Sequence, residues 1–189
     1  MKILFYTFLL LLTFSCAKKE SKVPDIFQLK SANSITQNND VLYWKKKKFS
    51  GYCFELNSKN DTLLLEGYVN GLLHGVCKKW YPNKQLQEVR FYKNGKKDGK
   101  QMGYWENGNK RFSFFCSNEA YEGELKEWTF DGKLIHHGHY ENGQEEGSQK
   151  LWYNNGKTRA NYVIIKGKRY GLLGTKNCKN VSDSIFIVQ

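Results

Sequence analysis

The 189-residue sequence has few of the features that define several common protein classes. Prolines number only 2 while aromatic residues make up 15% of the chain, which argues against disorder. No two cysteines have the CxxC spacing of a zinc site. Gly156-Lys157-Thr158 is similar to the end of a phosphate-binding loop, but Leu151 stands where the first glycine of that loop must be. The sequence therefore excludes a zinc finger and a P-loop nucleotide site.

Acidic residues are fewer than basic residues. Lys and Arg number 30 against 18 for Asp and Glu, so the formal net charge is +12 and the pI is about 9.4. A basic balance favours anionic partners such as lipid headgroups, acidic glycans or nucleic acid. A solvated basic surface with no dedicated ligand explains the same charge. The charge alone does not choose among these.

A long hydrophobic run is also missing, because the apolar stretch at residues 3–14 is too short for a membrane-spanning helix. With Lys2 as the only charge before it, the stretch is typical of a secretory signal. Leu12-Thr13-Phe14-Ser15-Cys16 resembles a bacterial lipobox, so we predict a signal peptide at residues 1–15 and a lipid on Cys16. An uncleaved anchor helix or a plain signal peptide is the alternative. The lipid would tether the protein to a membrane without spanning it.

Residues 16–40 are predicted to be the lipidated N-terminus followed by a flexible tether. Lysines, serines and asparagines dominate this stretch, and it has no sustained helical or strand period. A tether of this kind lets an anchored domain stand off its membrane.

The rest of the chain is a repeat. Glycines recur every 24 residues, and a fixed period of this length indicates a repeat array. The series comprises Gly51, Gly75, Gly99, Gly123, Gly147 and Gly171. We divide residues 41–171 into a half unit at 41–51 and full units at 52–75, 76–99, 100–123, 124–147 and 148–171.

Each unit is predicted to contain two strands and two turns. Asn94-Gly95 and Asn107-Gly108 represent the two turn positions, and such pairs tolerate the positive φ that tight hairpins need. The predicted fold is all-β: an elongated antiparallel β-meander built of 24-residue hairpins. The half unit is expected to cap one end, and residues 172–189, with a last strand at 182–188, the other.

Two neighbouring aromatic columns mark the first strand of each unit. Trp80 and Tyr81 begin them, and successive strand residues point to opposite faces. One column therefore lines an exposed surface, interleaved with basic residues, that is suited to sugars or anionic groups. A purely structural aromatic surface is the alternative. The predicted binding residues are Trp80, Tyr81, Lys96, Lys97, Trp105, Trp128, Trp152 and Tyr153.

Catalytic and metal sites find little support in the sequence. In the cluster at residues 136–139, His137 and His139 share a strand face and are weak candidates for a metal, with exposed surface histidines as the alternative. Cys116 stands in a buried column and is expected to be a small hydrophobic residue rather than a nucleophile. Cys53 and Cys77 occupy equivalent columns about 9–10 Å apart, too far for a disulfide. We predict no enzyme activity and no cofactor.

The pattern of Trp-Tyr, Asn-Gly, an aromatic residue and a second Asn-Gly closed by glycine resembles MORN repeats, in the longer variant of bacterial envelope proteins. Residues 80–99 and 128–147 are the clearest copies. The resemblance implies a scaffold that binds membranes, lipids or proteins, and some relatives carry the label antitoxin. An antitoxin meets its toxin in the cytoplasm, whereas the signal indicates export, which also argues against nucleic acid.

The predicted function is a non-catalytic, lipid-anchored module of the bacterial cell envelope, at the outer membrane or facing the periplasm. Its predicted partners are a membrane, reached through the lipid, and a protein, with an anionic lipid or glycan as a further class. The alternative is an antitoxin or immunity protein that neutralises a toxin by binding it.

Overall fold

The structure, a computed structural model, describes residues 22–174. These residues form strands and turns without a helix, so none could be a membrane-spanning helix in this part of the chain. The strands are β1 (Phe27–Leu29), β2 (Ile35–Asn38), β3 (Val41–Trp44), β4 (Lys47–Lys48), β5 (Gly51–Leu56), β6 (Thr62–Val69), β7 (Leu72–Leu73), β8 (Gly75–Trp80), β9 (Leu86–Lys93), β10 (Lys96–Lys97), β11 (Gly99–Tyr104), β12 (Lys110–Ser117), β13 (Ala120–Trp128), β14 (Leu134–Glu141), β15 (Gln144–Trp152), β16 (Thr158–Ile165) and β17 (Lys168–Leu172).

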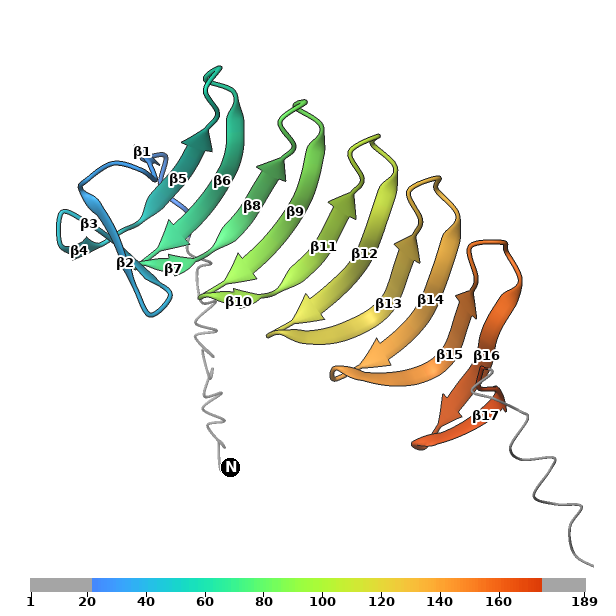
Figure 1. The fold of residues 1–189 in the computed structure, drawn as a ribbon. Helices are drawn as coiled ribbons and strands as arrows, with labels where there is room; N and C mark the ends of the chain where they lie inside the picture. Colours follow the sequence, from blue (N-terminus) through green and yellow to red (C-terminus); the bar gives the residue numbers. More distant parts are fainter. Residues whose placement is uncertain (1–21, 175–189) are drawn as a thin grey trace, which may run out of the picture.

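One long sheet dominates the molecule. Its order is β1-β5-β6-β8-β9-β11-β12-β13-β14-β15-β16-β17, with β7 beside β6 and β10 beside β9. From β5 onwards each strand pairs antiparallel with the next in this order, and the hairpins follow one another as a twisted row (Figure 1). The predicted all-β meander of hairpin repeats is confirmed.

The turns lie where the repeat pattern places them. In the turn that closes each unit, Asn94 and Gly95 have φ of 51° and 84°, and the same left-handed pair recurs at Asn70-Gly71 and Asn142-Gly143. Residues with side chains tolerate this region poorly, and asparagine and glycine tolerate it best. The other turn, at residues 81–85 and its equivalents, is longer and is preceded by a register shift such as that between Lys79 and Trp80.

The sheet buries two columns at 24-residue spacing. One, on the first strand of each unit, contains Cys53, Cys77, Gln101, Leu125 and Gln149, and all five are buried. The other, on the second strand, contains Tyr68, Tyr92, Cys116, Tyr140 and Ile164, and is buried or half-buried. A single layer of strands can bury side chains only against neighbouring units, so the core is a row of stacked columns.

The prediction of a flexible tether over residues 16–40 is wrong for the described part, residues 22–40. Strand β1 pairs in parallel with β5, and β2 joins β3 and β4 in a separate three-stranded sheet. The tether prediction missed the apolar residues Ile26, Phe27 and Ile35, and the Phe27 ring stacks on Tyr52 with centroids 5.2 Å apart. This segment covers the first edge of the array, because an open strand edge invites unwanted pairing.

The predicted half unit, residues 41–51, packs over the first full hairpin. Leu42 and Phe49 form a buried cluster with Cys53 and Tyr68. The Leu42 amide donates to the Gly71 carbonyl at 2.8 Å, which joins the small sheet to the turn of the first full unit. The predicted signal peptide with Cys16, and the predicted strand at residues 182–188, lie outside the described residues.

Candidate binding surface

The hairpin register sorts side chains onto two faces of the sheet. Lys79 pairs with Glu88, Glu88 with Gly103, and Gly103 with Phe112. Directly opposed residues in antiparallel strands point to the same side, so these residues share one face with the buried columns. We call this side the groove face and the opposite side the outer face.

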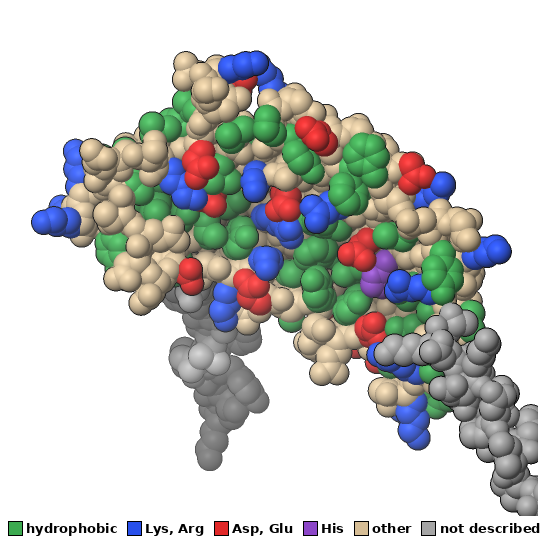
Figure 2. Space-filling view, in the orientation of Figure 1, with side chains coloured by type: hydrophobic (Ala, Val, Ile, Leu, Met, Phe, Trp, Pro, Cys, Tyr) green, Lys and Arg blue, Asp and Glu red, His purple; other side chains and the backbone are tan. Residues whose placement is uncertain are grey.

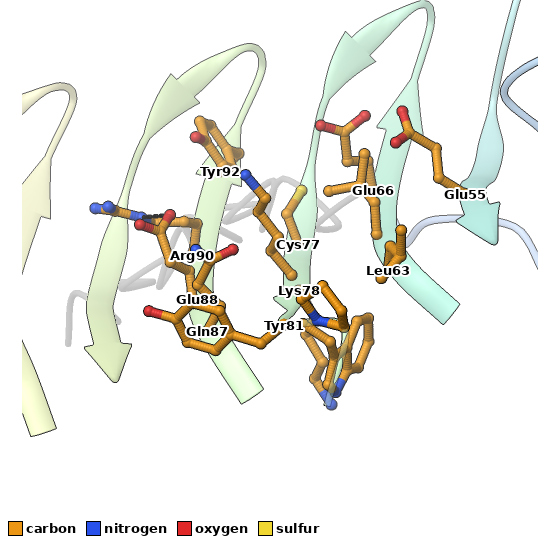
Figure 3. Close-up of a pocket in the computed structure, with 14 residues that line it drawn as sticks. Glu55, Leu63, Glu66, Cys77, Lys78, Tyr81, Gln87, Glu88, Arg90 and Tyr92 are labelled. Carbon is orange, nitrogen blue, oxygen red and sulfur yellow. Dashed lines mark hydrogen bonds and ion pairs between the residues drawn. The ribbon is translucent and has the colours of Figure 1, made fainter. Parts of the chain in front are cut away.

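A groove of about 620 Å³ lies on the groove face, over β5, β6, β8 and β9. Figure 3 shows Tyr81 at one end of it and Tyr92 and Glu66 at the other. Trp80 adds a second aromatic wall beside Tyr81. The groove therefore combines aromatic walls with side chains of both charges.

Most charges in the groove already have partners. Arg90 Nε donates to Glu88 Oε2 at 3.1 Å. At the other end, Lys30 Nζ lies 2.9 Å from Glu66 Oε2, which also accepts a hydrogen bond from the Tyr68 hydroxyl at 2.8 Å. Lys79 is exposed and forms no ion pair with any residue in the range 22–174. It is a groove cation that remains available to a ligand.

An aromatic stripe continues from the groove along the same face. Ring centroids lie 5.4 Å apart for Phe112 and Phe114, 4.9 Å for Phe114 and Tyr121, and 5.4 Å for Tyr121 and Tyr140. The guanidinium of Arg90 lies 4.5 Å from the Phe112 centroid, in cation–π geometry. Figure 2 shows one face of the molecule, where hydrophobic side chains form a band with interspersed basic and acidic ones.

Only two of the predicted binding residues, Trp80 and Tyr81, line the groove. Trp128 lies in a hollow with Lys110, whose Nζ is 5.7 Å from its ring. Trp152 and Tyr153 line another hollow beside Arg159. These three aromatic residues therefore lie away from the groove.

Lys96 and Lys97 form β10, next to the turn that closes their unit. The Lys97 amide donates to the Glu119 carboxylate at 2.5 Å, and its ammonium group lies 3.5 Å from the same carboxylate. Neither lysine lines the groove.

The second aromatic column links one unit to the next. The Tyr81 hydroxyl donates to the Tyr104 carbonyl at 3.0 Å, and Trp105 Nε1 donates to the Trp128 carbonyl at 3.0 Å. The Asn83 and Asn107 amides make the same forward contacts to Glu106 and Phe130. Sequence reasoning missed this role. The recurrence every 24 residues of side chains that end in a hydrogen-bond donor could have predicted it.

Sequence reasoning also missed the aromatic residues that extend the binding surface. Phe112, Phe114, Tyr121 and Tyr140 lie with Arg90 on the groove face. The signal was present in the alternation of the second strands, but their face depends on the register of each hairpin.

The histidines engage carboxylates. His137 Nε2 lies 3.1 Å from Glu124, which also accepts from Lys126, and His136 Nδ1 lies 3.1 Å from Glu127. Hydrogen bonds from Lys126 and then His137 lower the pKa of Glu124, and the bond from His136 lowers that of Glu127. The residues that the structure describes contain no group of three or more metal-ligand side chains that could hold an ion. His139 is exposed.

Cys53, Cys77 and Cys116 are free and buried. Burial raises the pKa of Cys53 to about 11 and that of Cys77 to about 12, and it also raises that of Cys116. The thiolate is the reactive form, so these are unreactive packing residues. The prediction of Cys116 as a small buried hydrophobic residue is confirmed, with 2% exposure.

The fold and its surface define a β-hairpin repeat protein. The family model for the MORN repeat variant matches residues 73–94 and 121–142, two stretches that lie within the 24-residue array. The chain thus contains MORN-type variant repeats, which are generally non-catalytic binding modules. A search of curated proteins finds no match.

Proposed function

We propose that this protein is a non-catalytic binding module of the bacterial cell envelope, anchored by a lipid on Cys16, whose groove holds a segment of a partner protein. The observation that carries the proposal is the groove itself. It offers aromatic walls at Trp80 and Tyr81, the unpaired cation of Lys79, and Arg90 fixed between Glu88 and Phe112.

A protein segment fits this chemistry better than a simple anion does. Trp, Tyr and Arg are the residue types that dominate protein-binding energy. Glu55, Glu66 and Glu88 also line the groove, so its field is mixed rather than uniformly positive. A partner segment with apolar, basic and acidic side chains can satisfy both signs, whereas an anionic lipid or glycan gains nothing from three carboxylates.

The sequence around Cys16 supports the proposed anchor and envelope location. Residue 22 already belongs to the described fold, so only residues 17–21 separate Cys16 from it. A chain spans at most about 3.3–3.6 Å per residue, so this linker keeps the array close to the membrane. A partner bound in the groove is then held near the same surface.

The experiment is chemical cross-linking in native envelopes, followed by purification and mass spectrometry. Wild type is compared with a groove variant, Lys79→Glu, and with Cys16→Ala. One stoichiometric protein lost in Lys79→Glu supports the groove, and release of Cys16→Ala into the soluble fraction supports the anchor. Recovery of lipid or glycan alone contradicts the protein-binding proposal. If the captured protein is a toxin, the result supports the alternative function as an antitoxin.

A further inference from the structure

Within residues 22–174, the last strand of the sheet is an open edge. Strand β17 (Lys168–Leu172) ends the strand order and pairs only with β16 among the described residues. All five of its residues are exposed, and Ile165, Tyr170, Leu172 and Leu173 are each more than half exposed. An exposed edge strand with apolar side chains is a template for pairing with another strand.

The other end of the sheet differs. Strand β1 is only 3 residues long, follows Pro24, and is fixed by the ion pair of Lys30 with Glu66. Short strands and nearby prolines are the usual means of protecting an edge. Of the two edge strands, β17 is therefore the one that lacks these protecting features and can pair with an additional strand.

Backbone contacts between successive units show which atoms of β17 face outward. The turn that closes each unit donates an amide to a carbonyl of the preceding unit. These bonds are Gly71 to Phe49 at 2.6 Å, Gly95 to Leu73 at 2.8 Å, Glu119 to Lys97 at 2.9 Å and Gly143 to Tyr121 at 2.9 Å. The acceptors are spaced by 24 residues, and two steps after Tyr121 stands Arg169.

The Arg169 carbonyl is therefore the acceptor that a following unit would use. In an antiparallel strand the N–H and C=O of one residue point to the same side, so the Arg169 amide faces outward too. An incoming strand finds both a donor and an acceptor at this residue.

The charge around this edge indicates what kind of strand it accepts. Residues 147–173 contain six basic residues and no Asp or Glu: Lys150, Lys157, Arg159, Lys166, Lys168 and Arg169. Only Arg169 has an ion-pair partner in the described structure, Glu145 at 2.9 Å. The edge is thus a positively charged surface with exposed apolar side chains.

Two other occupants fit this charge poorly. A second copy pairing β17 to β17 would bring two basic edges together, and like charges directly opposite each other destabilise a strand pair. Residues 175–189 of the same chain carry Lys176 and Lys179 against a single Asp183, so they add positive charge. Neither neutralises the basic residues of the last unit.

We propose that β17 receives an extended, acidic strand of another protein by backbone pairing at Arg169. Backbone hydrogen bonds supply affinity in such strand addition, and alternate side chains supply specificity. Glu or Asp side chains meet Lys168 and neighbouring basic residues, and apolar ones cover Tyr170 and Leu172. This site is separate from the groove and does not depend on it.

The test uses the full chain in mild detergent and a defined probe, a short acidic peptide that alternates Glu and Val, with its Lys-Val counterpart as control. Binding is measured by fluorescence anisotropy, and hydrogen exchange is followed over residues 168–172. The acidic peptide is expected to bind and to slow exchange there, because pairing protects outward amides. Charge attraction without pairing leaves the exchange unchanged and overturns the proposal.

A matched pair of variants isolates the backbone. Arg169→Pro removes the outward amide, and proline is tolerated at such edge positions. Arg169→Ala removes the same side chain but keeps the amide. We expect Arg169→Pro to bind the acidic peptide about tenfold more weakly than Arg169→Ala, the effect of losing one backbone hydrogen bond. Equal binding by the two variants contradicts the proposal.

Two further outcomes would assign the edge to another occupant. If the full chain does not bind but a variant ending at Gly174 does, residues 175–189 occupy β17. If the protein dimerises at the concentrations used and the dimer excludes the peptide, a second copy occupies it. Either result overturns an acidic partner strand as the natural occupant.

Discussion

The indole Nε1 of Trp105 donates a hydrogen bond to the backbone carbonyl of Trp128, 3.0 Å away in the next unit. Tyr81 makes the same forward contact to the Tyr104 carbonyl. Because a repeat protein is stabilised through contacts between neighbours, these bonds couple units that share no large common core. Tyr81 and Trp105, each beside a long turn, thus stabilise the array.

Tyr81→Phe is expected to lower the free energy of unfolding by about 1 kcal/mol, because the ring remains but its part-buried hydrogen bond is lost. Trp105→Phe should cost more, because it loses its hydrogen bond and also replaces the indole by a smaller ring. The control is Tyr104→Phe, whose hydroxyl has only Met102 Sδ, at 3.8 Å, as a hydrogen-bond partner within residues 22–174. Urea unfolding measures all three, and a loss for Tyr104→Phe as large as for Tyr81→Phe would refute the link between units.

Gly138 lies under two side chains of the groove face. A Cβ there would lie 2.3 Å from Gln149 Oε1 and 3.0 Å from His136 Nε2. Gly138→Ala is expected to destabilise by about 1–3 kcal/mol through overpacking. In a Gln149→Ala background the same change should cost clearly less. A double-mutant cycle measures this coupling, and additive effects would contradict the close approach.

Arg90 is expected to matter for both partner binding and stability, because its guanidinium contacts Glu88 and lies over Phe112. Arg90→Ala should reduce capture of the partner in native envelopes about tenfold or more, as for a central arginine of an interface. The control is Arg111→Ala, which removes an exposed cation over Trp105 at 5.0 Å. Equal losses in the two variants would point to non-specific charge rather than the groove.

Stability should fall in acid through Glu127. The hydrogen bond from His136 lowers the pKa of this carboxyl below its ordinary value of 4.5. A carboxyl with a lowered pKa stabilises the fold above its unfolded pKa, and this contribution is lost as the pH falls from 4.5 through the lower folded value. Glu127→Gln should flatten the dependence in that window.

Urea unfolding at a series of pH values checks the role of Glu127. Glu106→Gln is the control, because its carboxylate forms no ion pair within residues 22–174. If Glu106→Gln flattens the dependence of stability on pH equally, the hydrogen bond from His136 to Glu127 is not its cause.

The buried thiols should resist modification in the folded protein. Cys53 and Cys77 have raised pKa values of about 11 and about 12, so the thiolate is scarce near neutral pH. In a Cys16→Ala, Cys178→Ala variant we expect no reaction with a maleimide until denaturant is added. Mass spectrometry counts the adducts, and rapid labelling of the native variant would contradict the burial of these residues.

Much of the fold was predictable because its signals are local. Asn94-Gly95 predicts a turn because both residue types tolerate positive φ. The 24-residue period then predicts a turn at the equivalent position of every unit. The N-terminal segment could not be placed in this way, because β1 is held by a parallel edge contact with β5 and by Lys30, and neither is periodic. Local pattern does not reveal a contact that a distant strand supplies.

The candidate site was predicted only in part for a related reason. Trp80 and Tyr81 were visible as a repeated pair, and both line the groove. Arg90 and Phe112 lie in different units, and their contact depends on how β9, β11 and β12 are aligned, which sets the face of each side chain. Lys96 and Lys97 looked basic and exposed, but neither lines the groove.

The most direct test of the central claim is site-specific photo-cross-linking in native envelopes. A photoreactive amino acid replaces Gln87, which lines the groove, or, as the control, Lys133, which is exposed in a turn and does not line it. The account predicts one protein adduct from position 87 and none from position 133. Equal adducts from both positions, or lipid adducts alone, would contradict a protein-binding groove.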